Sequence, residues 1–309
     1  MDLLRDLENV PDALKGGVLT VGVFDGVHVG HQAVLGRAVE RARELGAAAV
    51  VYTFHPHPLQ VLEPDRAPPQ IQTFGQKLEM MRAMGVAGAI WPRDLVRVLA
   101  TPPEAFIREV AGDALAVRAM VEGADFRFGA GGAGDPALLH DLAAAMGFEV
   151  EFVQPVELDG ERVSSTRIRD LVSAGRVDEA ARCLGRPYSY VGTVVEGHHR
   201  GGRLGYPTVN VSAPQFLAPA EGVYAGWARV RGRRYAAAVS VGRAPTFGED
   251  EPITVEAYLL DFDGELYGEQ VTVEFVAYLR SQEAFADAET LKAAMADDCR
   301  RVREALGDG

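Results

Sequence analysis

The chain has 309 residues, enough for about two domains of ordinary size, each with a core of its own. Its net charge of −13 argues against a nucleic-acid-binding protein, which needs a basic face. Hydrophobic residues make up 48% and charged residues 24%, a balance that excludes a fibrous or disordered chain. The composition is that of a globular enzyme.

The N-terminal segment, the length of the apolar runs and the cysteines indicate where the protein is found. The first residues lack a basic segment followed by an apolar one, and no apolar run approaches the ~20 residues that span a bilayer. Cys183 and Cys299 lie too far apart for a disulfide framework or a metal-ligand set, and both fall in helical patterns. We therefore expect a cytoplasmic protein without membrane segments.

Strands and helices alternate in the first half of the chain. In chain order the expected elements are a strand at 17–24, a helix at 34–45, a strand at 47–54, a helix at 74–84, a strand at 86–91, a helix at 103–111, a strand at 117–122, a helix at 136–146 and a strand at 148–153. This alternation predicts a doubly wound α/β domain, a parallel sheet with helices on both faces. Ligands bind such sheets beyond the carboxyl ends of the strands.

The pattern changes near residue 185, after two helices that we expect at 165–174 and 177–184. The following strands are expected at 188–195, 222–231, 235–241, 253–262 and 270–278. Close strands with turn signals between them predict a small antiparallel β-barrel. A last helix carries apolar residues at helical spacing and should pack on the barrel: Leu291, Met295, Cys299, Val302 and Leu306. We place the domains at 1–185 and 186–309.

The segment 22–31, Gly-Val-Phe-Asp-Gly-Val-His-Val-Gly-His, ends the first strand and opens the first helix. His28 and His31 are three residues apart, so on a helix they share one face. Gly26 and Gly30 let the backbone approach a ligand closely, and a helix N-terminus attracts phosphate. Two imidazoles there would stabilise charge growing on a pentavalent phosphorus, which suits direct nucleotidyl transfer. The alternative is that one histidine packs and the other is solvated.

Two further segments accompany it. Residues 53–58, Thr-Phe-His-Pro-His-Pro, end the second strand, and their two histidines leave open a metal site, although no carboxylate or thiol partner accompanies them. Residues 164–169, Ser-Ser-Thr-Arg-Ile-Arg, start a helix, where the hydroxyls suit a capping role. Arg167 and Arg169 suggest a second role for this segment, because two guanidinium groups on nearly one face of the helix would hold a triphosphate.

The second half has a constellation of its own at 197–210, Gly-His-His-Arg-Gly-Gly-Arg-Leu-Gly-Tyr-Pro-Thr-Val-Asn. The glycine-rich loop alone is equally consistent with a turn, but Thr208 and Asn210 then offer oxygen ligands on one face of a strand. Hard Mg²⁺ prefers such oxygens together with phosphate oxygens. No Walker sequence GxxxxGK[ST] occurs, so a kinase here must bind phosphate through glycine amides, arginine and metal.

These motifs resemble the prokaryotic bifunctional riboflavin kinase/FAD synthetases over roughly residues 15–306. The segments 22–31 and 164–169 resemble the two signatures of the nucleotidyltransferase superfamily, and 123–129, Gly-Ala-Asp-Phe-Arg-Phe-Gly, matches the FAD synthetase pattern. The resemblance implies catalytic roles for His28, His31 and Arg167. It implies ATP binding by Phe24, Asp25, Gly26, Gly30, Ser165, Thr166 and Arg169. It implies flavin binding by Phe54, Asp125 and Phe128.

The barrel half resembles the flavokinases through its loop, its Pro-Thr-Val-Asn motif and the segments 242–247 and 256–268. The resemblance implies that Thr208 and Asn210 bind Mg²⁺, that Glu256 is the base for the riboflavin hydroxyl, and that Arg280 lies near the flavin. It also implies ATP binding by Gly197, Gly201, Gly205 and Pro207. The chain departs from the family at Gly202, at Ser240, at Val209 and in the uncharged loop 130–133.

The whole pattern predicts an enzyme that phosphorylates riboflavin to FMN in the barrel and adenylylates FMN to FAD in the α/β domain. Its partners would be the small molecules riboflavin, FMN and ATP, with no nucleic acid or membrane, and the protein would be a monomer or a transient oligomer. Three alternatives stay open at this point: an FAD synthetase with a decayed kinase, a flavin-sensing regulator without turnover, and a nucleotidyltransferase for another substrate. The intact pair His28 and His31 argues against the regulator.

Overall fold

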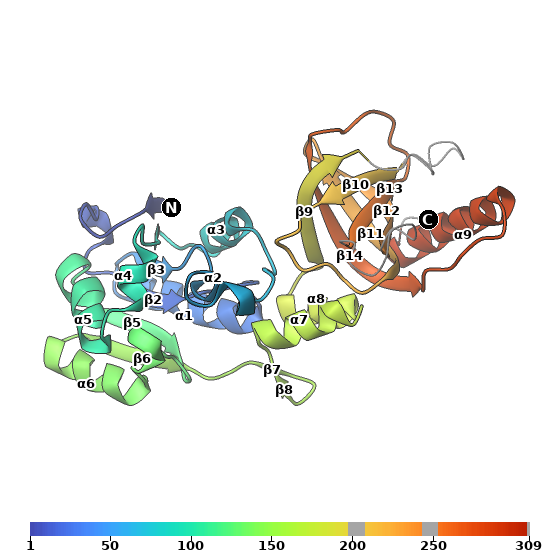
Figure 1. Ribbon diagram of the computed structural model, residues 1–309. Coiled ribbons are helices and arrows are strands. Elements are labelled where there is room, and N and C mark those ends of the chain that lie inside the picture. The colour runs from blue at the N-terminus through green and yellow to red at the C-terminus, as the bar shows by residue number, and fades with distance from the viewer. Residues whose placement is uncertain (197–207, 243–252, 308–309) are drawn as a thin grey trace. The chain divides into compact units, whose positions relative to one another are not determined.

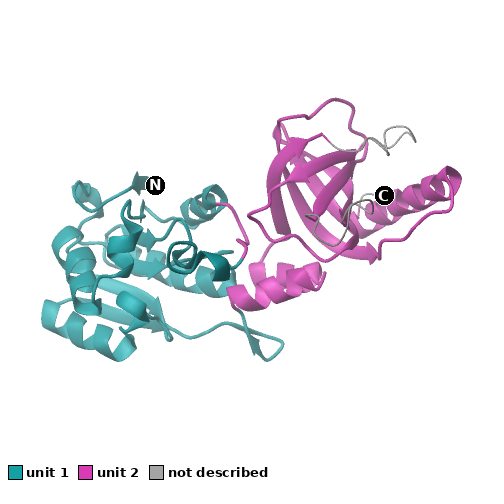
Figure 2. Cartoon of the chain, in the orientation of Figure 1, with its two compact units in different colours: residues 1–68, 74–163 teal, residues 69–73, 164–309 magenta. Residues whose placement is uncertain are grey.

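A computed structural model describes residues 1–196, 208–242 and 253–307. The chain divides into two compact units, one made of Met1–Pro68 and Phe74–Val163, the other of Pro69–Thr73 and Ser164–Gly309. Figure 2 shows them in two colours. Because each unit has its own core and its own sheet, each is described by itself.

The first unit is built on a parallel sheet of six strands in the order β1-β4-β3-β2-β5-β6 (Figure 1). Its strands are β1 (Asp2–Leu4), β2 (Val18–Gly22), β3 (Ala49–Thr53), β4 (Gly88–Ile90), β5 (Ala119–Gly123) and β6 (Glu149–Val153). The chain leaves β2 toward β3 on one side and later returns to β5 on the other. The carboxyl ends of β2 and β5 therefore flank the position where doubly wound sheets bind ligands.

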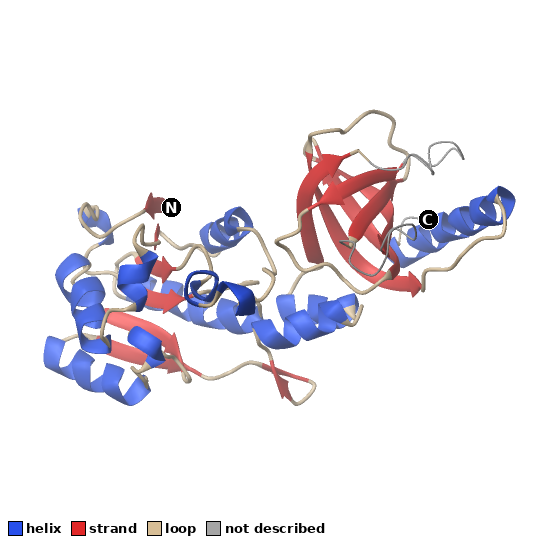
Figure 3. Cartoon of the chain, viewed as in Figure 1, coloured by secondary structure: helices blue, strands red, loops and turns tan. Residues whose placement is uncertain are grey.

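Apolar side chains fill both faces of this sheet. Leu19 and Val21 of β2 pack on one face, and their neighbour Val18 packs on the other. Helices surround the strands in Figure 3. They are α1 (Val29–Glu44), α2 (Pro58–Leu62), α3 (Phe74–Ala83), α4 (Leu95–Leu99), α5 (Pro103–Ile107) and α6 (Pro136–Met146), with a π-helical segment at Arg108–Ala114 and 3₁₀ turns at Asp12–Leu14, Pro64–Arg66 and Ala130–Gly132. The expected doubly wound α/β domain is confirmed.

Most elements expected from the sequence recur within about two residues at their ends. Exceptions include α1, which begins at Val29 rather than at residue 34, and β13, which ends at Leu259 rather than at residue 262. Helix α6 has the expected bounds because Asp135 caps its N-terminus and Gly147 ends it at φ 80°. The described elements that had no expectation are short: β1, α2, α4, the 3₁₀ turns and the hairpin of β7 (Glu157–Leu158) and β8 (Glu161–Arg162). Each is two to five residues long, too short for a periodic pattern.

The second unit contains a closed antiparallel barrel in the order β10-β13-β12-β11-β14-β9. Its strands are β9 (Tyr188–Val195), β10 (Thr208–Ser212), β11 (Gly222–Val230), β12 (Arg233–Gly242), β13 (Thr254–Leu259) and β14 (Gln270–Arg280). Closure pairs every strand on both sides, which leaves no open sheet edge among these strands. The expected antiparallel barrel is confirmed.

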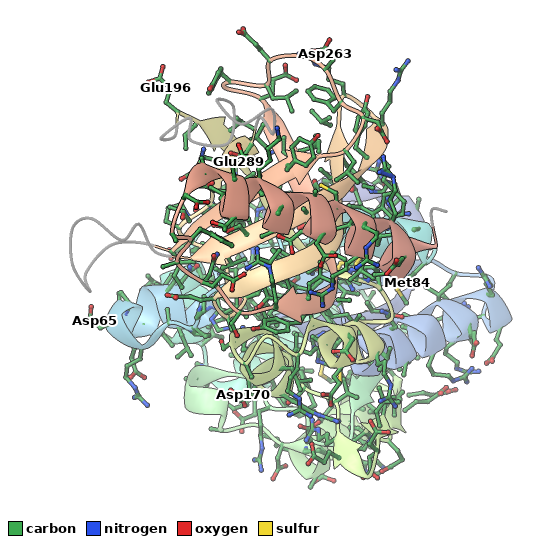
Figure 4. The ribbon with its side chains drawn as sticks, turned by 90° about the vertical axis from the view of Figure 1, so that its right-hand side faces the viewer. Asp65, Met84, Asp170, Glu196, Asp263 and Glu289 are labelled. Atoms are coloured by element: carbon green, nitrogen blue, oxygen red, sulfur yellow. The ribbon has the colours of Figure 1, made fainter. Side chains whose placement is uncertain are left out.

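The described part of this unit also contains the helices α7 (Ser165–Ser173), α8 (Val177–Leu184) and α9 (Ala288–Leu306). Figure 4 looks onto α9, which crosses the barrel strands from its first turn at Glu289. Val302 of α9 is fully buried against Ala225, Ala236 and Leu260, so the expected packing of the last helix is confirmed. Within the described ranges, no helix is long and apolar enough to cross a membrane.

Candidate active sites

The turn that follows β2 has an unusual backbone. Phe24 and Val27 have φ values of 52° and 35°, in the left-handed region that ordinary side chains avoid, and Gly26 has φ 86°. The amide of Val27 donates to the carbonyl of Phe24 at 3.2 Å and closes the turn. Such strain costs about 1–3 kcal/mol per residue and persists only where surrounding contacts enforce it. It marks this turn as a candidate site.

His28 is the N-cap of α1. Its Nδ1 accepts a hydrogen bond from the backbone N–H of His31 at 3.2 Å. A neutral imidazole that accepts through Nδ1 carries its proton on Nε2, so His28 is set as an Nε2–H donor. The two imidazole rings stack with centroids 3.6 Å apart. His28 and His31 therefore lie on one face, as expected: His28 caps α1, and His31 lies in its first turn.

His31 is held as a neutral ring. Burial, and then the nearby His28 and Lys77, lower its pKa well below the usual 6.5. Its Nδ1 is buried without a hydrogen-bond partner among the described residues. Gly30 leaves room for the stack, because a Cβ there would lie 3.1 Å from the ring of His28, and the ring would have to shift by a few tenths of an ångström. Phe24 completes the arrangement with its ring edge-on to His31 at 5.3 Å.

Of the residues expected near the flavin, Phe54 and Asp125 follow the carboxyl ends of strands, as the histidines do. Phe54 directly follows β3 and meets Tyr52 edge-on at 5.7 Å. Asp125 follows β5 and pairs with Arg162. Phe128 is only 4% exposed and belongs to the core of the unit, so its expected contact with flavin stays a prediction.

The backbone conformation explains the small residues of the uncharged loop 130–133. Gly131 and Gly132 have φ values of 61° and 65°. A Cβ on the preceding Gly129 would lie 2.6 Å from the backbone of Pro103. Glycine suits all three positions because side chains would be strained there or would clash.

The second signature forms the start of α7, in the second unit. Ser164 caps the helix, and its Oγ accepts from the N–H of Arg167 at 3.1 Å. Arg169 donates to the carbonyl of Pro69 at 2.9 Å. Thr166 is exposed, whereas Ser165 and Arg167 are half-buried. The capping role is confirmed for Ser164, and the ATP-binding role of the other four residues stays a prediction.

In the barrel, strand pairing brings three polar residues into one row. Asn210 of β10 pairs directly with Glu256 of β13, which pairs directly with Ser240 of β12. Directly paired residues point to the same face, with Cβ atoms about 4.5–5.5 Å apart. Val255 and Ala257 alternate with Glu256 and are buried in the barrel. The row therefore lies on the outer face.

Helix α9 packs on the same face. Tyr258, two residues after Glu256, contacts the cluster around Val302 of α9, and Thr208 pairs directly with Tyr258. The structure thus gathers Thr208, Asn210 and Glu256 on two adjacent strands. The other expected nucleotide-binding residues of the kinase lie outside the described residues: Gly197, Gly201, Gly205 and Pro207.

Ser240 and Arg280 both have partners. The amide of Gln282 donates to the Ser240 hydroxyl at 2.7 Å and to the Val241 carbonyl at 3.2 Å. Arg280 donates to both oxygens of the buried Asp298 at 2.9 and 2.7 Å, which joins β14 to α9. Its flavin contact stays a prediction, and a structural role is evident.

Sequence motifs did not indicate two polar residues of these sites, Lys77 and Gln282. Lys77 of α3 is 6% exposed and donates to the carbonyl of Val23 at 2.7 Å. Val23 directly precedes the turn of residues 24–28 that ends at His28, here named the histidine turn. A single lysine in a helical pattern gives no signal, because burial of its ammonium depends on contacts with other elements.

The metal alternative at His55 and His57 finds no support. Within the described ranges, no group of three or more His, Cys, Asp or Glu side chains could hold a metal ion. The ring of His55 stacks on Phe74 with centroids 4.3 Å apart. Nδ1 of His57 accepts from the N–H of Leu59 at 3.1 Å, as an N-cap of α2.

Comparison with known proteins gives two matching family models. The model described as FAD synthetase matches residues 10–167, and the one described as riboflavin kinase matches residues 184–306. A bifunctional riboflavin kinase/FMN adenylyltransferase of Pseudomonas fluorescens is 37% identical over 303 residues, covering 98% of this chain and 97% of that protein. The protein of that name from Escherichia coli strain K12 is 34% identical, covering 99% of this chain and 98% of its own.

One solved structure is similar over almost the whole chain. It is described as a macrolide-efflux protein of Streptococcus pneumoniae, with a TM-score of 0.87, 28% identity, and coverage of 97% of this chain and 98% of that one. The two domains and the comparisons together define a two-domain, ATP-using transferase. The chain belongs to the family of bifunctional riboflavin kinase/FMN adenylyltransferases. This membership argues against a nucleotidyltransferase with an unrelated substrate.

Proposed function

We propose that this chain phosphorylates riboflavin to FMN at the outer face of its barrel and adenylylates FMN to FAD at the histidine turn. The observation that carries the first site is the direct pairing of Asn210 with Glu256. The stacked pair of His28 and His31 after β2 supports the second. The two reactions share one intermediate, FMN, and both consume ATP.

In the adenylylation, a phosphate oxygen of FMN attacks the α-phosphorus of ATP and pyrophosphate leaves. His28 presents an Nε2–H donor, because its Nδ1 already accepts from the backbone. Such a donor stabilises the charge that builds up on the phosphate oxygens in the transition state. The proposal assigns binding of ATP phosphates to Ser165, Thr166, Arg167 and Arg169 in the second unit. It assigns contacts with ATP to Phe24, Asp25, Gly26 and Gly30 in the first unit.

In the kinase reaction, Glu256 accepts the proton of the riboflavin 5′-hydroxyl as that oxygen attacks the γ-phosphorus of ATP. The bond from the γ-phosphorus to the β,γ-bridging oxygen breaks, and ADP leaves. Two oxygen atoms on the same face could serve as metal ligands: the hydroxyl of Thr208 and the side-chain oxygen of Asn210. Both are hard oxygen ligands, which fit Mg²⁺. When bound, the metal ion would neutralise charge on the ATP phosphates.

The functional boundary proposed at residue 185 assigns α7 to the adenylyltransferase, although α7 and α8 are compact with the barrel unit. The FAD synthetase model ends at residue 167, inside α7, which supports this assignment. A cytoplasmic location is consistent with two ATP-consuming steps. We propose a monomer or a transient oligomer.

One assay tests the function: the purified protein is incubated with riboflavin and MgATP, and FMN and FAD are separated by chromatography. The proposal predicts that FMN appears first and FAD follows. FAD from supplied FMN, without FMN from riboflavin, would identify a decayed kinase. Flavin binding without either product would identify a sensor and refute the proposed function.

A further inference from the structure

Lys77 is a buried cation in the unit that carries the histidine turn. Lysine is almost never fully buried unless its ammonium has partners, yet only 6% of Lys77 is exposed. Its Nζ lies 2.7 Å from the carbonyl oxygen of Val23 and 3.4 Å from that of Phe54. It also lies 5.5 Å from the ring centroid of Phe74, one turn earlier on α3.

The two carbonyls belong to the ends of adjacent strands. The ladder between β2 and β3 ends with the pair Gly22 and Thr53, and Val23 and Phe54 are the next residues. Beyond that pair the strands no longer bond to each other in the ladder. The ammonium of Lys77 joins them there, at the carboxyl edge of the sheet where ligands bind in this fold. The hydroxyl of Thr53 adds a longer hydrogen bond to the same Val23 carbonyl, at 3.3 Å.

Val23 directly precedes the strained turn. The hydrogen bond from Lys77 fixes the carbonyl before Phe24, whose φ of 52° needs support from its surroundings. At the far end of the turn, the amide of Gln32 donates to the carbonyl of Val27 at 2.8 Å. The turn that presents His28 is thus held at both ends, by Lys77 before it and by Gln32 after it.

We propose that Lys77 is a positioning residue for adenylyl transfer, which fixes the histidine turn by joining the ends of β2 and β3. The inference rests on the proposed role of His28 and His31. Lys77 acts through these histidines and through Phe54, and it needs no contact with substrate.

The charge of Lys77 gives this role an observable signature. Burial lowers the pKa of Lys77 to about 8, while Asp25 acts in the opposite direction, so the side chain is mostly charged at pH 7. Together with burial and His28, this charge lowers the pKa of His31. The charged or titratable groups that change the pKa of His31 are therefore His28, the N-cap of its helix, and Lys77 on α3. Asp25 of the turn raises the pKa of Lys77.

Lys77→Met removes the ammonium and keeps an unbranched apolar side chain. We expect kcat for FAD formation from FMN to fall about 10- to 100-fold, because small displacements of reacting groups have effects of that size. Riboflavin phosphorylation by the same protein should be unchanged. The pKa of His31, followed by ring-proton NMR and assigned with His31→Gln, should rise.

Arg82→Met is the matched control, because Arg82 is an exposed cation on the same helix. It should leave both activities and the pKa of His31 unchanged. Lys77→Gln keeps hydrogen-bond donors but removes the charge; it should raise the pKa of His31 and keep more adenylylation than Lys77→Met. If Lys77→Met does not fold, the Gln variant decides the question by the same two measurements.

Wild-type adenylylation in the Met variant, or a loss of rate with the pKa of His31 unchanged in both variants, would overturn the proposal. His28→Ala is measured in parallel. If His28→Ala leaves adenylylation intact, the assignment of the site is wrong. If His28→Ala abolishes it and Lys77→Met does not impair it, the role of Lys77 alone is wrong.

Discussion

Asn210 and Glu256 are directly paired across strands β10 and β13, although 45 residues separate them in the chain. The pairing places an amide and a carboxylate on one face of the barrel, so the proposed metal ligand and the proposed general base are neighbours. The kinase site proposed above follows from this register.

Glu256→Gln should abolish the kinase and spare the adenylyltransferase. Removing a general base typically lowers the rate about 10²- to 10⁴-fold, so FMN formation from riboflavin should fall by that amount. FAD formation from supplied FMN should continue. The exposed Glu289→Gln on α9 is the control and should leave both rates unchanged. Equal loss of both activities in the folded Glu256 variant would contradict the two-site arrangement.

His28→Ala should have the opposite effect. It removes the Nε2–H donor and the cap of α1, and loss of one such donor typically costs about 10²- to 10³-fold in kcat. The measurement is FAD formation from FMN and MgATP, with riboflavin phosphorylation in the same preparation as the reference. His140→Ala serves as the control because the side chain of His140 is 74% exposed on α6. Unchanged FAD synthesis in His28→Ala would remove this residue from the site.

Glu122→Gln should stabilise the first unit at alkaline pH. Glu122 is 1% exposed in β5 and accepts from the N–H of Val21 at 2.8 Å, and burial raises its pKa well above 4.5. Above pH 4.5 the folded protein retains a proton that the unfolded chain releases, so stability falls as pH rises until the folded-state pKa is passed. Glutamine keeps the acceptor and removes the titration.

The gain in Tm from Glu122→Gln should therefore be larger at pH 8 than at pH 5. Each unit of pKa difference corresponds to about 1.4 kcal/mol. Calorimetry of both proteins at the two pH values measures the effect, and Glu149→Gln, an exposed glutamate on the neighbouring strand β6, is the control. An equal gain at both pH values would show that Glu122 is not protonated in the folded protein.

Asp298→Ala should loosen α9 from the barrel. The carboxylate is buried and receives two hydrogen bonds from Arg280, so its removal leaves a largely buried guanidinium without that partner, at a cost of about 3 kcal/mol. Thermal unfolding of the barrel unit and the KM for riboflavin are measured together. Asp297→Ala, an exposed neighbour, is the control. A normal Tm with a raised KM would instead favour the predicted contact of Arg280 with flavin.

Local signals in the sequence were sufficient for most elements. Helix α8 and strand β9 have the expected bounds, because each carries its period and its terminators within a few residues, such as Gly185 at φ 71° after α8. The motifs of the histidine turn and of α7 are contiguous in the chain as well. A contiguous motif can be recognised without knowledge of the fold.

The positions of Lys77 and Gln282 could not be predicted in this way. Lys77 is buried because two carbonyls from the ends of β2 and β3 surround its ammonium, and neither lies on its own helix. Gln282 reaches Ser240 across 42 residues of chain. Such contacts arise from strand order and register, which depend on long-range packing rather than on a local pattern.

The sequence by itself determined the two domain classes and the residues that carry their motifs, because helix caps, turn residues and hydrophobic periodicity act over a few neighbours. Only the tertiary structure decided that Asn210 is paired with Glu256, that His28 stacks on His31 and accepts from its N–H, and that Lys77 joins two strands at the histidine turn. The physical reason is burial. Side chains and carbonyls distant in the chain exchange water for one another only when the fold encloses them.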